Sequence, residues 1–177
     1  MKKFSHRLAT IDDMPALNDL MNRAMEHFLP NFLSPEQVAA SYEIMGLDSR
    51  LVADKSYFLI FDEGSLAGCG GWSRRQTLFG GDHSSGRNPR KLDPKTEPAR
   101  IRAMYTDPDH ARKGVGRFIL QLCEHAAASE GFLRVELAAT SAGIALYKAC
   151  GYRPIKAWNE ITTSGIPVPL TLMRKNL

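Results

Sequence analysis

The chain has few cysteines, no long apolar run and only a small excess of positive charge. Its three cysteines, Cys69, Cys123 and Cys150, are odd in number and form no C-x-x-C pair, so they indicate no disulfide framework and favour a reducing, cytoplasmic setting. The five histidines lack the close spacing of zinc ligands, so no metal site is predicted. No apolar stretch approaches the length of a membrane span, and the start MKKFSHRL lacks the apolar run of a signal peptide.

The composition is that of a soluble globular protein. Hydrophobic residues make up 44% of the 177 residues and charged residues 24%, a balance that predicts a single domain, residues 1–177, with a sizeable core. The net charge of +4 suits an anionic ligand without favouring nucleic acid. The sequence also lacks the interleaved aromatic and basic residues that single-strand binders use. We therefore expect neither a nucleic-acid partner nor a membrane.

Residues 102–117, RAMYTDPDHARKGVGR, have the pattern of a strand, a glycine-rich turn and a helix. Pro108 ends the strand because it has no N–H to give to a sheet, and apolar residues recur at helical spacing from Val115 onward. Gly114 and Gly116 let the backbone approach an anion closely, and the first amides of a helix have no partner within it. The turn is therefore predicted to bind an anion. Positive charge beside it comes from Arg112, Lys113 and Arg117.

The same turn excludes two common phosphate-binding patterns and resembles a third. No Lys-Ser or Lys-Thr follows the glycines, as a P-loop requires, and no third glycine completes a dinucleotide-binding fingerprint. The stretch resembles the acetyl-coenzyme A motif of the GNAT superfamily of N-acetyltransferases, V-x-P-x-x-[QR]-x-x-G-x-[GA]. Ala111 departs from it at the Gln/Arg position, and the neighbouring Arg112 is the candidate for the missing charge. The matching residues are Thr106 (in place of valine), Pro108, Gly114 and Gly116.

A second segment, residues 136–152 (ELAATSAGIALYKACGY), resembles the other half of the same family pattern. In that pattern a strand, a small-residue turn and a short helix lead to a tyrosine and a Gly-Phe or Gly-Tyr ending. Tyr147 matches the tyrosine, and residues 151–152 match the ending. Ser141 begins the expected helix, and it or Thr140 falls near a polar position of the pattern. Because two ordered motifs are far more specific than one, the chain is identified as a member of the GNAT superfamily.

The resemblance implies an α/β (α+β) fold, with a mixed, mostly antiparallel sheet of six or seven strands flanked by about four helices. Local signals fit this expectation. Ser34 and Gln37 predict the capped start of a helix, and residues 62–65 predict a hairpin turn. Residues 78–98 form a long polar segment that is either a lid over the acceptor pocket or a mobile loop without function. A bulge or a close backbone approach is predicted at Gly68, Gly70 and Gly71.

The resemblance also implies the reaction and the residues that carry it. An acetyl group would pass from acetyl-coenzyme A, the co-substrate, to a primary amine by direct transfer in a ternary complex, and no cysteine is placed for a covalent intermediate. Tyr147 would protonate the departing thiolate, since its ordinary pKa of about 10 keeps it protonated at neutral pH. The cofactor would be bound by Met104, Tyr105, Thr106, Ala111, Arg112, Lys113, Gly114, Val115, Gly116, Arg117 and Ser141.

The acceptor side is less defined by the sequence. The acceptor is a small amine, an amino acid, an antibiotic or a protein amine, and a homodimer is left open. The general base is left open among Glu97, His83, Glu136 and an ordered water chain. Two other functions remain: a regulatory module that binds coenzyme A without catalysis, and a toxin of this family that acetylates aminoacyl-tRNA and would normally show a stronger basic face. Candidate substrate contacts are Phe32, Tyr42, Trp72 and His83.

Overall fold

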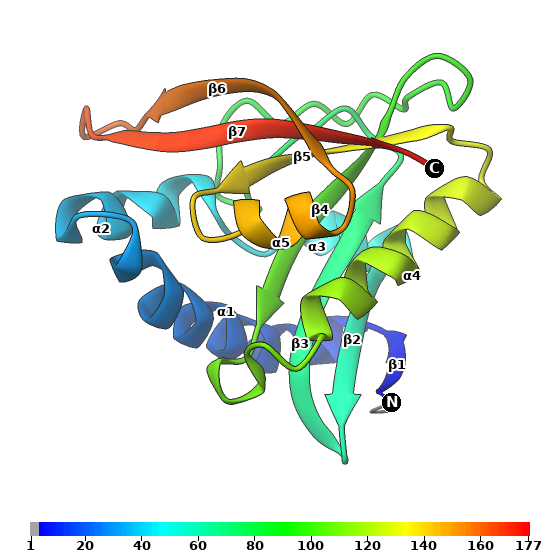
Figure 1. The fold of residues 1–177 in the computed structure, drawn as a ribbon, viewed down its shortest axis with the longest axis horizontal. Coiled ribbons are helices and arrows are strands. Elements are labelled where there is room, and N and C mark those ends of the chain that lie inside the picture. Colours follow the sequence, from blue (N-terminus) through cyan, green and yellow to red (C-terminus); the bar gives the residue numbers. More distant parts are fainter. Residues whose placement is uncertain (1–3) are drawn as a thin grey trace.

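The computed structural model of the protein describes residues 4–177. A seven-stranded sheet has the order β1-β2-β3-β4-β5-β7-β6, and within the described chain β4 and β5 are the parallel pair (Figure 1). The mixed, mostly antiparallel sheet is thus confirmed, with five α-helices where about four were expected. The strands are β1 (Ser5–Leu8), β2 (Tyr57–Asp62), β3 (Ser65–Ser73), β4 (Ala99–Thr106), β5 (Arg134–Thr140), β6 (Arg153–Ile161) and β7 (Pro167–Asn176). The helices are α1 (Met14–Phe28), α2 (Pro35–Ile44), α3 (Ser49–Ala53), α4 (Val115–Ser129) and α5 (Ile144–Ala149), with short 3-10 helices η1 (Ile11–Asp13), η2 (Leu29–Asn31) and η3 (Pro108–His110).

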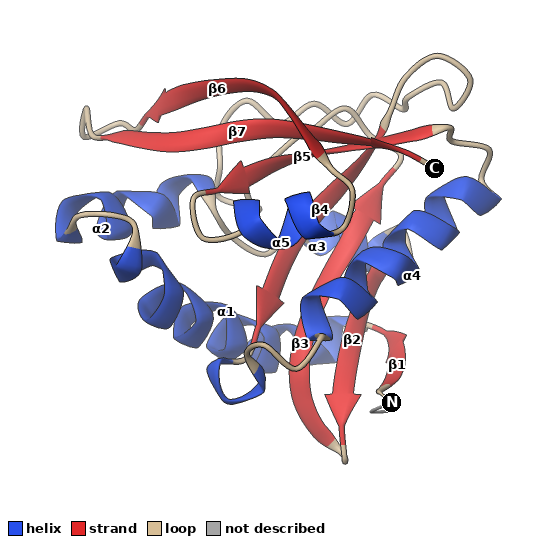
Figure 2. Ribbon diagram, in the orientation of Figure 1, coloured by secondary structure: helices blue, strands red, loops and turns tan. Residues whose placement is uncertain are grey.

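Helices cover both faces of the sheet, and each face has its own apolar core (Figure 2). Side chains alternate between the two faces of a strand, so consecutive buried residues of β2 belong to different cores. Leu59 packs with the α1 side, and Ile60 packs with the α4 side. The stripe of α1 that includes Leu17 and Met21 is buried, as its helical spacing predicts.

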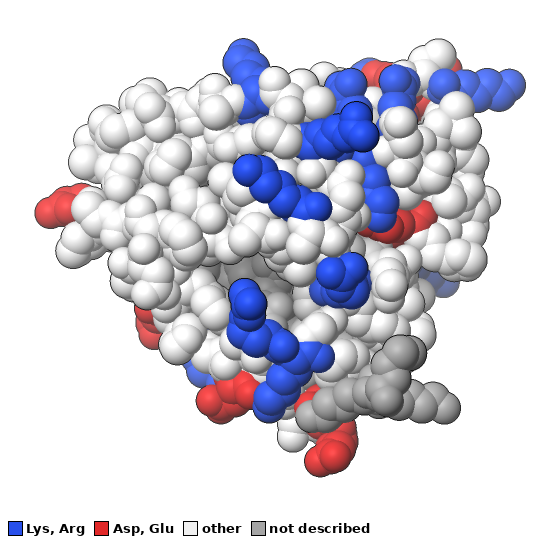
Figure 3. Space-filling model, viewed as in Figure 1, with Lys and Arg blue, Asp and Glu red and all other residues white. Residues whose placement is uncertain are grey.

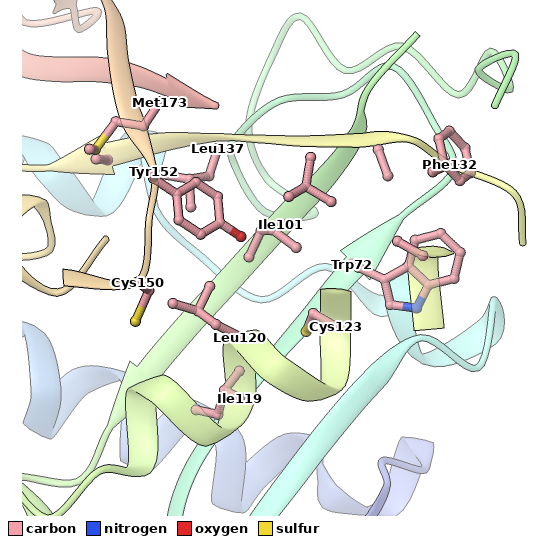
Figure 4. Packing of buried hydrophobic residues seen from close by; sticks show 14 of the residues in the cluster. Trp72, Ile101, Ile119, Leu120, Cys123, Phe132, Leu137, Cys150, Tyr152 and Met173 are labelled. Carbon is pink, nitrogen blue, oxygen red and sulfur yellow. The ribbon is translucent and has the colours of Figure 1, made fainter. Parts of the chain in front are cut away.

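Trp72 lies in the core on the α4 side (Figure 4). Its side chain is only 2% exposed, and its ring packs edge-on against Phe132 with 6.0 Å between ring centroids. Ile119, Leu120 and Cys123 of α4 belong to the same core. Trp72 is therefore a core residue, and a contact with substrate stays a prediction that its burial does not support.

The glycines of β3 let α4 pack close to the sheet, as the sequence predicts. A Cβ at Gly68 would lie 2.6 Å from Val115 Cγ1, and one at Gly70 would lie 2.5 Å from Ile119 Cγ2. Both distances are shorter than any van der Waals contact. The register between β3 and β4 also shifts between Cys69 and Gly71, so the predicted bulge is present.

Several local signals give the elements expected of them. Ser34 and Gln37 form a capping box: the Gln37 N–H donates to Ser34 Oγ at 3.2 Å, and the Ser34 N–H donates to Gln37 Oε1 at 3.1 Å. The turn between β2 and β3 has left-handed φ angles at Glu63 and Gly64. The helix expected to begin at Ser141 begins later, at Ile144. No helix within residues 4–177 is both long enough and apolar enough to cross a membrane.

The parallel pair opens soon after it begins. β4 and β5 pair through Ala99 with Val135 and through Arg100 with Glu136. From there the two strands diverge, and β5 continues to pair with β7 along its whole length. The later residues of β4 are therefore not paired with β5.

Candidate active site

A cavity of about 80 Å³ lies where β4 and β5 diverge. Such a volume holds several water molecules or a small organic group. Most of the lining is apolar or glycine, and the polar groups come from Arg102, Tyr105, Thr140 and Tyr147. The walls are residues 44–46 at the end of α2, residues 78–80 after β3, residues 101–105 of β4, Leu137, Ala138 and Thr140 of β5, Tyr147 of α5 and Leu170 of β7.

The backbone of β4 is distorted beside this cavity. Ala103 has a φ of +49°, a left-handed conformation that costs a non-glycine residue free energy. Its carbonyl accepts a hydrogen bond from Tyr57 Oη at 2.7 Å. Because the peptide between Ala103 and Met104 is trans and planar, the Met104 N–H points away from Tyr57. The bulge therefore turns a peptide of the cavity wall out of the regular ladder.

Tyr147 reaches the cavity from α5, where it is the fourth residue of a one-and-a-half-turn helix. Its ring packs against Tyr152 with 5.9 Å between ring centroids. Burial of the phenol, with smaller contributions from the neighbouring Cys123 and Cys150 thiols, raises the pKa of Tyr147 to about 12. The hydroxyl is therefore protonated at neutral pH.

The glycine-rich turn leads into α4 next to the cavity. Gly114 is the N-cap of α4 with a φ of +94°, and a Cβ built there would meet no other atom of the chain within 4 Å. The first hydrogen bond of the helix runs from the Phe118 N–H to Gly114 O at 3.0 Å. The N–H groups just before Phe118 therefore have no carbonyl partner within the helix. Figure 3 shows basic side chains around a hollow on the face that carries α5 and the start of α4. The exposed cations of this region are Arg112, Lys113, Arg117 and Lys148.

The second glycine of the turn lies against α5. A Cβ at Gly116 would lie 2.6 Å from Leu146 Cδ2, so Gly116 allows α4 to pack closely on α5. Asp107 holds the beginning of the turn: it accepts a hydrogen bond from the Asp109 N–H at 2.9 Å and forms an ion pair with Arg23 of α1. The turn is thus fixed to α1 on one side and to α5 on the other.

A buried arginine completes the cavity wall. Arg102 of β4 donates to Gly80 O at 2.6 Å, to Thr77 O at 3.2 Å and to Asp48 Oδ2 at 3.1 Å. Its side chain is 2% exposed, and burial lowers the pKa of its guanidinium from the ordinary value. Asp48 also pairs with Arg87. Arg102 thereby fastens residues 77–80 to the wall of the cavity, a role that sequence reasoning missed because its partners are distant in sequence.

A sequence model of the acetyltransferase (GNAT) family matches residues 18–152, more than half of the chain. The chain belongs to the GNAT acetyltransferase family. The match extends from α1 to the end of α5 and includes Ala103, Gly114 and Tyr147. No curated protein sequence matches this GNAT chain.

Solved structures of similar fold include several acetyltransferases of this family. A GCN5-related N-acetyltransferase from Rhodopseudomonas palustris aligns over 100% of this chain and 98% of its own, with a TM-score of 0.71 and 16% identity. The PaiA N-acetyltransferase from Thermoplasma acidophilum, solved in complex with coenzyme A, covers 99% of each chain with a TM-score of 0.64 and 15% identity. The ribosomal-protein-alanine N-acetyltransferase from Brucella melitensis aligns over 98% of this chain and 99% of its own, with a TM-score of 0.65 and 18% identity. At these identities the likeness shows the fold alone.

The acceptor contacts expected from the GNAT sequence do not line the cavity. Phe32 is 57% exposed beyond η2, and Tyr42 packs with the core on the α1 side. His83 holds its loop to α2, with Nε2 2.7 Å from Tyr42 O. The long loop does contribute to the wall, but through residues 78–80, which were not singled out as contacts. Of the expected residues, Met104, Tyr105 and Tyr147 do line the cavity.

The candidates for the general base are engaged elsewhere in the GNAT fold. Glu97 pairs with Arg90 at 2.6 Å, and this partner lowers the pKa of Glu97 to about 2. Glu136 accepts hydrogen bonds from Arg100 and from Arg174 Nε, the latter at 2.6 Å. Neither carboxylate lines the cavity. An ordered water chain is the alternative that these contacts leave for removal of the acceptor proton.

Proposed function

We propose that this GNAT protein moves an acetyl group from acetyl-coenzyme A to a primary amine by direct transfer in a ternary complex. The observation that carries the proposal is the alignment of three features along the opening between β4 and β5. These are the glycine-rich turn at Gly114, the bulge at Ala103 and the phenol of Tyr147 in the cavity.

The residues along this opening fit the chemistry of the donor. Its pyrophosphate needs unpaired amides and positive charge, which residues 112–117 supply around an N-cap with open space in front of it. Backbone groups of residues 104–106 would hold the pantetheine arm along the edge of β4 that β5 leaves free. Ala111 of the first motif would contribute a backbone contact, and Ser141 of the second a backbone or hydroxyl contact. When bound, the donor supplies an acetyl group activated as a thioester.

Two groups of the chain would then assist transfer. An N–H at the bulge, next to Ala103, would stabilise negative charge as it develops on the acetyl oxygen. Tyr147 would give its Oη proton to the departing sulfur, and the raised pKa of its phenol keeps that proton in place until it is needed. Both groups lie beside a mostly apolar wall, where electrostatic interactions are stronger than in water.

Direct transfer is favoured over a covalent enzyme intermediate by the positions of the cysteines. Cys69, Cys123 and Cys150 are all buried, and none belongs to the cavity wall of the described chain. Burial raises the pKa of the Cys69 thiol to about 12, so it carries almost no thiolate at neutral pH. Three unpaired thiols also support our proposal of a reducing, cytoplasmic compartment.

The acceptor is proposed to be a small-molecule amine or a protein amine. A homodimer is also proposed, with no interface assigned to it. The Brucella melitensis neighbour is named for a protein alanine, which supports the inclusion of protein amines. Incubation of the protein with acetyl-coenzyme A and a mixture of small amines and N-terminal peptides tests the proposal. We expect an acetylated product by mass spectrometry together with release of free coenzyme A. Binding of coenzyme A without any acetylated amine would favour a regulatory module, and acetylation confined to aminoacyl-tRNA would favour the toxin.

A further inference from the structure

We propose that the acceptor is an amine that carries no second positive charge. It enters the cavity in its neutral form, so no base in the cavity wall is needed to remove a proton from it. This inference rests on the proposed acetyl transfer and names the substrate class for it. The remainder of the acceptor is apolar or negatively charged.

The apolar preference follows from the walls that lie away from the glycine-rich turn. Ile44 and Leu170 line the cavity and belong to an apolar cluster between α2 and β7. Phe79, from the loop after β3, packs against Trp158 of β6 with 6.3 Å between ring centroids. An acceptor that enters from this side meets aliphatic and aromatic surface, which favours an apolar group by about 25 cal/mol per Å² buried.

The charge preference follows from Arg102. Among the described residues that line the cavity, Arg102 is the charged one, and no carboxylate or histidine accompanies it. Its partner Asp48 binds Arg87 in turn, and Arg87 pairs with Asp82 at 3.1 Å. The charges thus alternate outward from the cavity, with a cation nearest to it. A second ammonium group on the acceptor would be repelled by this buried guanidinium and would find no carboxylate in the wall.

The same charge explains how an amine can react without a base. A nearby cation disfavours an ammonium ion and so favours the neutral amine, which is the nucleophile. The other titratable groups around this space are Tyr105 of β4 and Tyr147 of α5, and burial raises the pKa of both phenols, so neither accepts a proton at neutral pH. Asp48 faces Arg102 from behind the wall and is held by two arginines.

A matched series of acceptors tests the charge preference on the wild-type protein. We would measure coenzyme A release with n-butylamine, 1,4-diaminobutane and 4-aminobutanoate, which have the same spacing but a neutral, a positive and a negative far end. We expect kcat/KM for 1,4-diaminobutane to be at least about tenfold below that for n-butylamine, and 4-aminobutanoate to be no worse than n-butylamine. A preference for the diamine would overturn the inference and leave the proposed function standing. Failure of all amines, peptides included, would overturn both.

The pH profile tests the absence of a base. We would compare L-leucinamide, which is an α-amine, with n-butylamine. The pH at which kcat/KM rises should differ by about two to three units between them, because the pKa values of the two amine classes differ by that much in water. A rise at the same pH for both acceptors would reveal a base on the protein and overturn the inference.

A variant links the preference to Arg102 itself. Arg102→Gln should reduce the discrimination between n-butylamine and 1,4-diaminobutane to less than about threefold, since the cation is removed. Arg50→Gln, a change of an exposed arginine on α3, is the matched control and should keep the wild-type ratio. Unchanged discrimination in folded Arg102→Gln would contradict the assignment of the selectivity to this residue. If that variant does not fold, the two wild-type measurements decide the inference.

Discussion

Tyr57 and Ala103 are joined by a hydrogen bond that crosses the width of β3. The Tyr57 hydroxyl of β2 donates to the Ala103 carbonyl of β4 at 2.7 Å, and the tyrosine is 2% exposed. Ala103 has the left-handed φ that forms the bulge beside the cavity. A residue two strands away therefore stabilises the distorted backbone that we assign to acetyl transfer.

The first prediction concerns this bond. Tyr57→Phe keeps the ring but leaves the Ala103 carbonyl without its side-chain donor, so the free energy of unfolding should fall by about 1–3 kcal/mol. Turnover should fall as well, because the strained bulge can relax. Denaturant unfolding and steady-state kinetics check the two effects. Tyr105→Phe is the comparison for stability, since its bond to Gly46 O is 3.4 Å long and should contribute less. Wild-type turnover in Tyr57→Phe would separate the bulge from catalysis.

The second prediction concerns Gly114. Gly114→Ala keeps the backbone N–H but adds a methyl group in the open space before α4 and strains a φ of +94°. Calorimetry should show about tenfold or greater loss of coenzyme A affinity. Arg112→Ala removes one exposed charge and should cost only about 1–2 kcal/mol of binding free energy, since the amides remain. Undiminished affinity in folded Gly114→Ala would remove the turn from the cofactor site.

The third prediction separates two possible roles of Gly116. The motif implies that a side chain at this position would crowd the pyrophosphate, whereas the structure places Leu146 of α5 there. Gly116→Val should therefore displace α5 and with it Tyr147, and lower turnover. Adding Leu146→Ala should restore much of the lost turnover by making room, a coupling that a double-mutant cycle measures. Equal loss in the single and double variants would favour crowding of the cofactor itself.

The fourth prediction follows from the burial of Trp72. Trp72→Ala should lower the free energy of unfolding by about 3–5 kcal/mol, because it leaves a large cavity beside Phe132. Among molecules that stay folded at low temperature, KM for the amine should be unchanged. A raised KM with wild-type stability would restore Trp72 as a substrate contact.

The parts of the site that depend on local sequence were predictable. Proline and glycine spacing located the turn before α4, the capping residues located α2, and the second motif located Tyr147. Each depends on residues within a few positions of one another, where steric and hydrogen-bonding rules apply directly.

The parts that depend on distant contacts were not predictable. Ala103 carries no glycine signal, and its conformation is supported by Tyr57, 46 positions away. Arg102 reads as one residue of an apolar strand, and its partner Asp48 is 54 positions away. Phe32 and Trp72 are both aromatic residues expected to contact substrate, yet one is exposed and the other buried. Neither of them lines the cavity, and the difference in their burial depends on tertiary packing.

The central claim is that Tyr147 donates the proton that completes acetyl transfer. Burial raises the pKa of its phenol to about 12, above the value of about 10 in an unfolded chain. The neutral form is therefore favoured by folding, and the donor stays protonated from neutral pH to about pH 11. Ionisation of the phenol before the reaction should therefore not lower the rate anywhere in that range.

Tyr147→Phe tests this claim most directly, because it keeps the ring and its packing on Tyr152 while removing the hydroxyl proton. Single-turnover measurement of coenzyme A release, with melting temperature and acetyl-coenzyme A affinity as controls, is the measurement. We predict a rate lower by about 10²- to 10⁴-fold, the range for one proton-transfer group, with both controls near wild type. A wild-type rate, with chemistry shown to be limiting, would contradict the account and assign the proton to water.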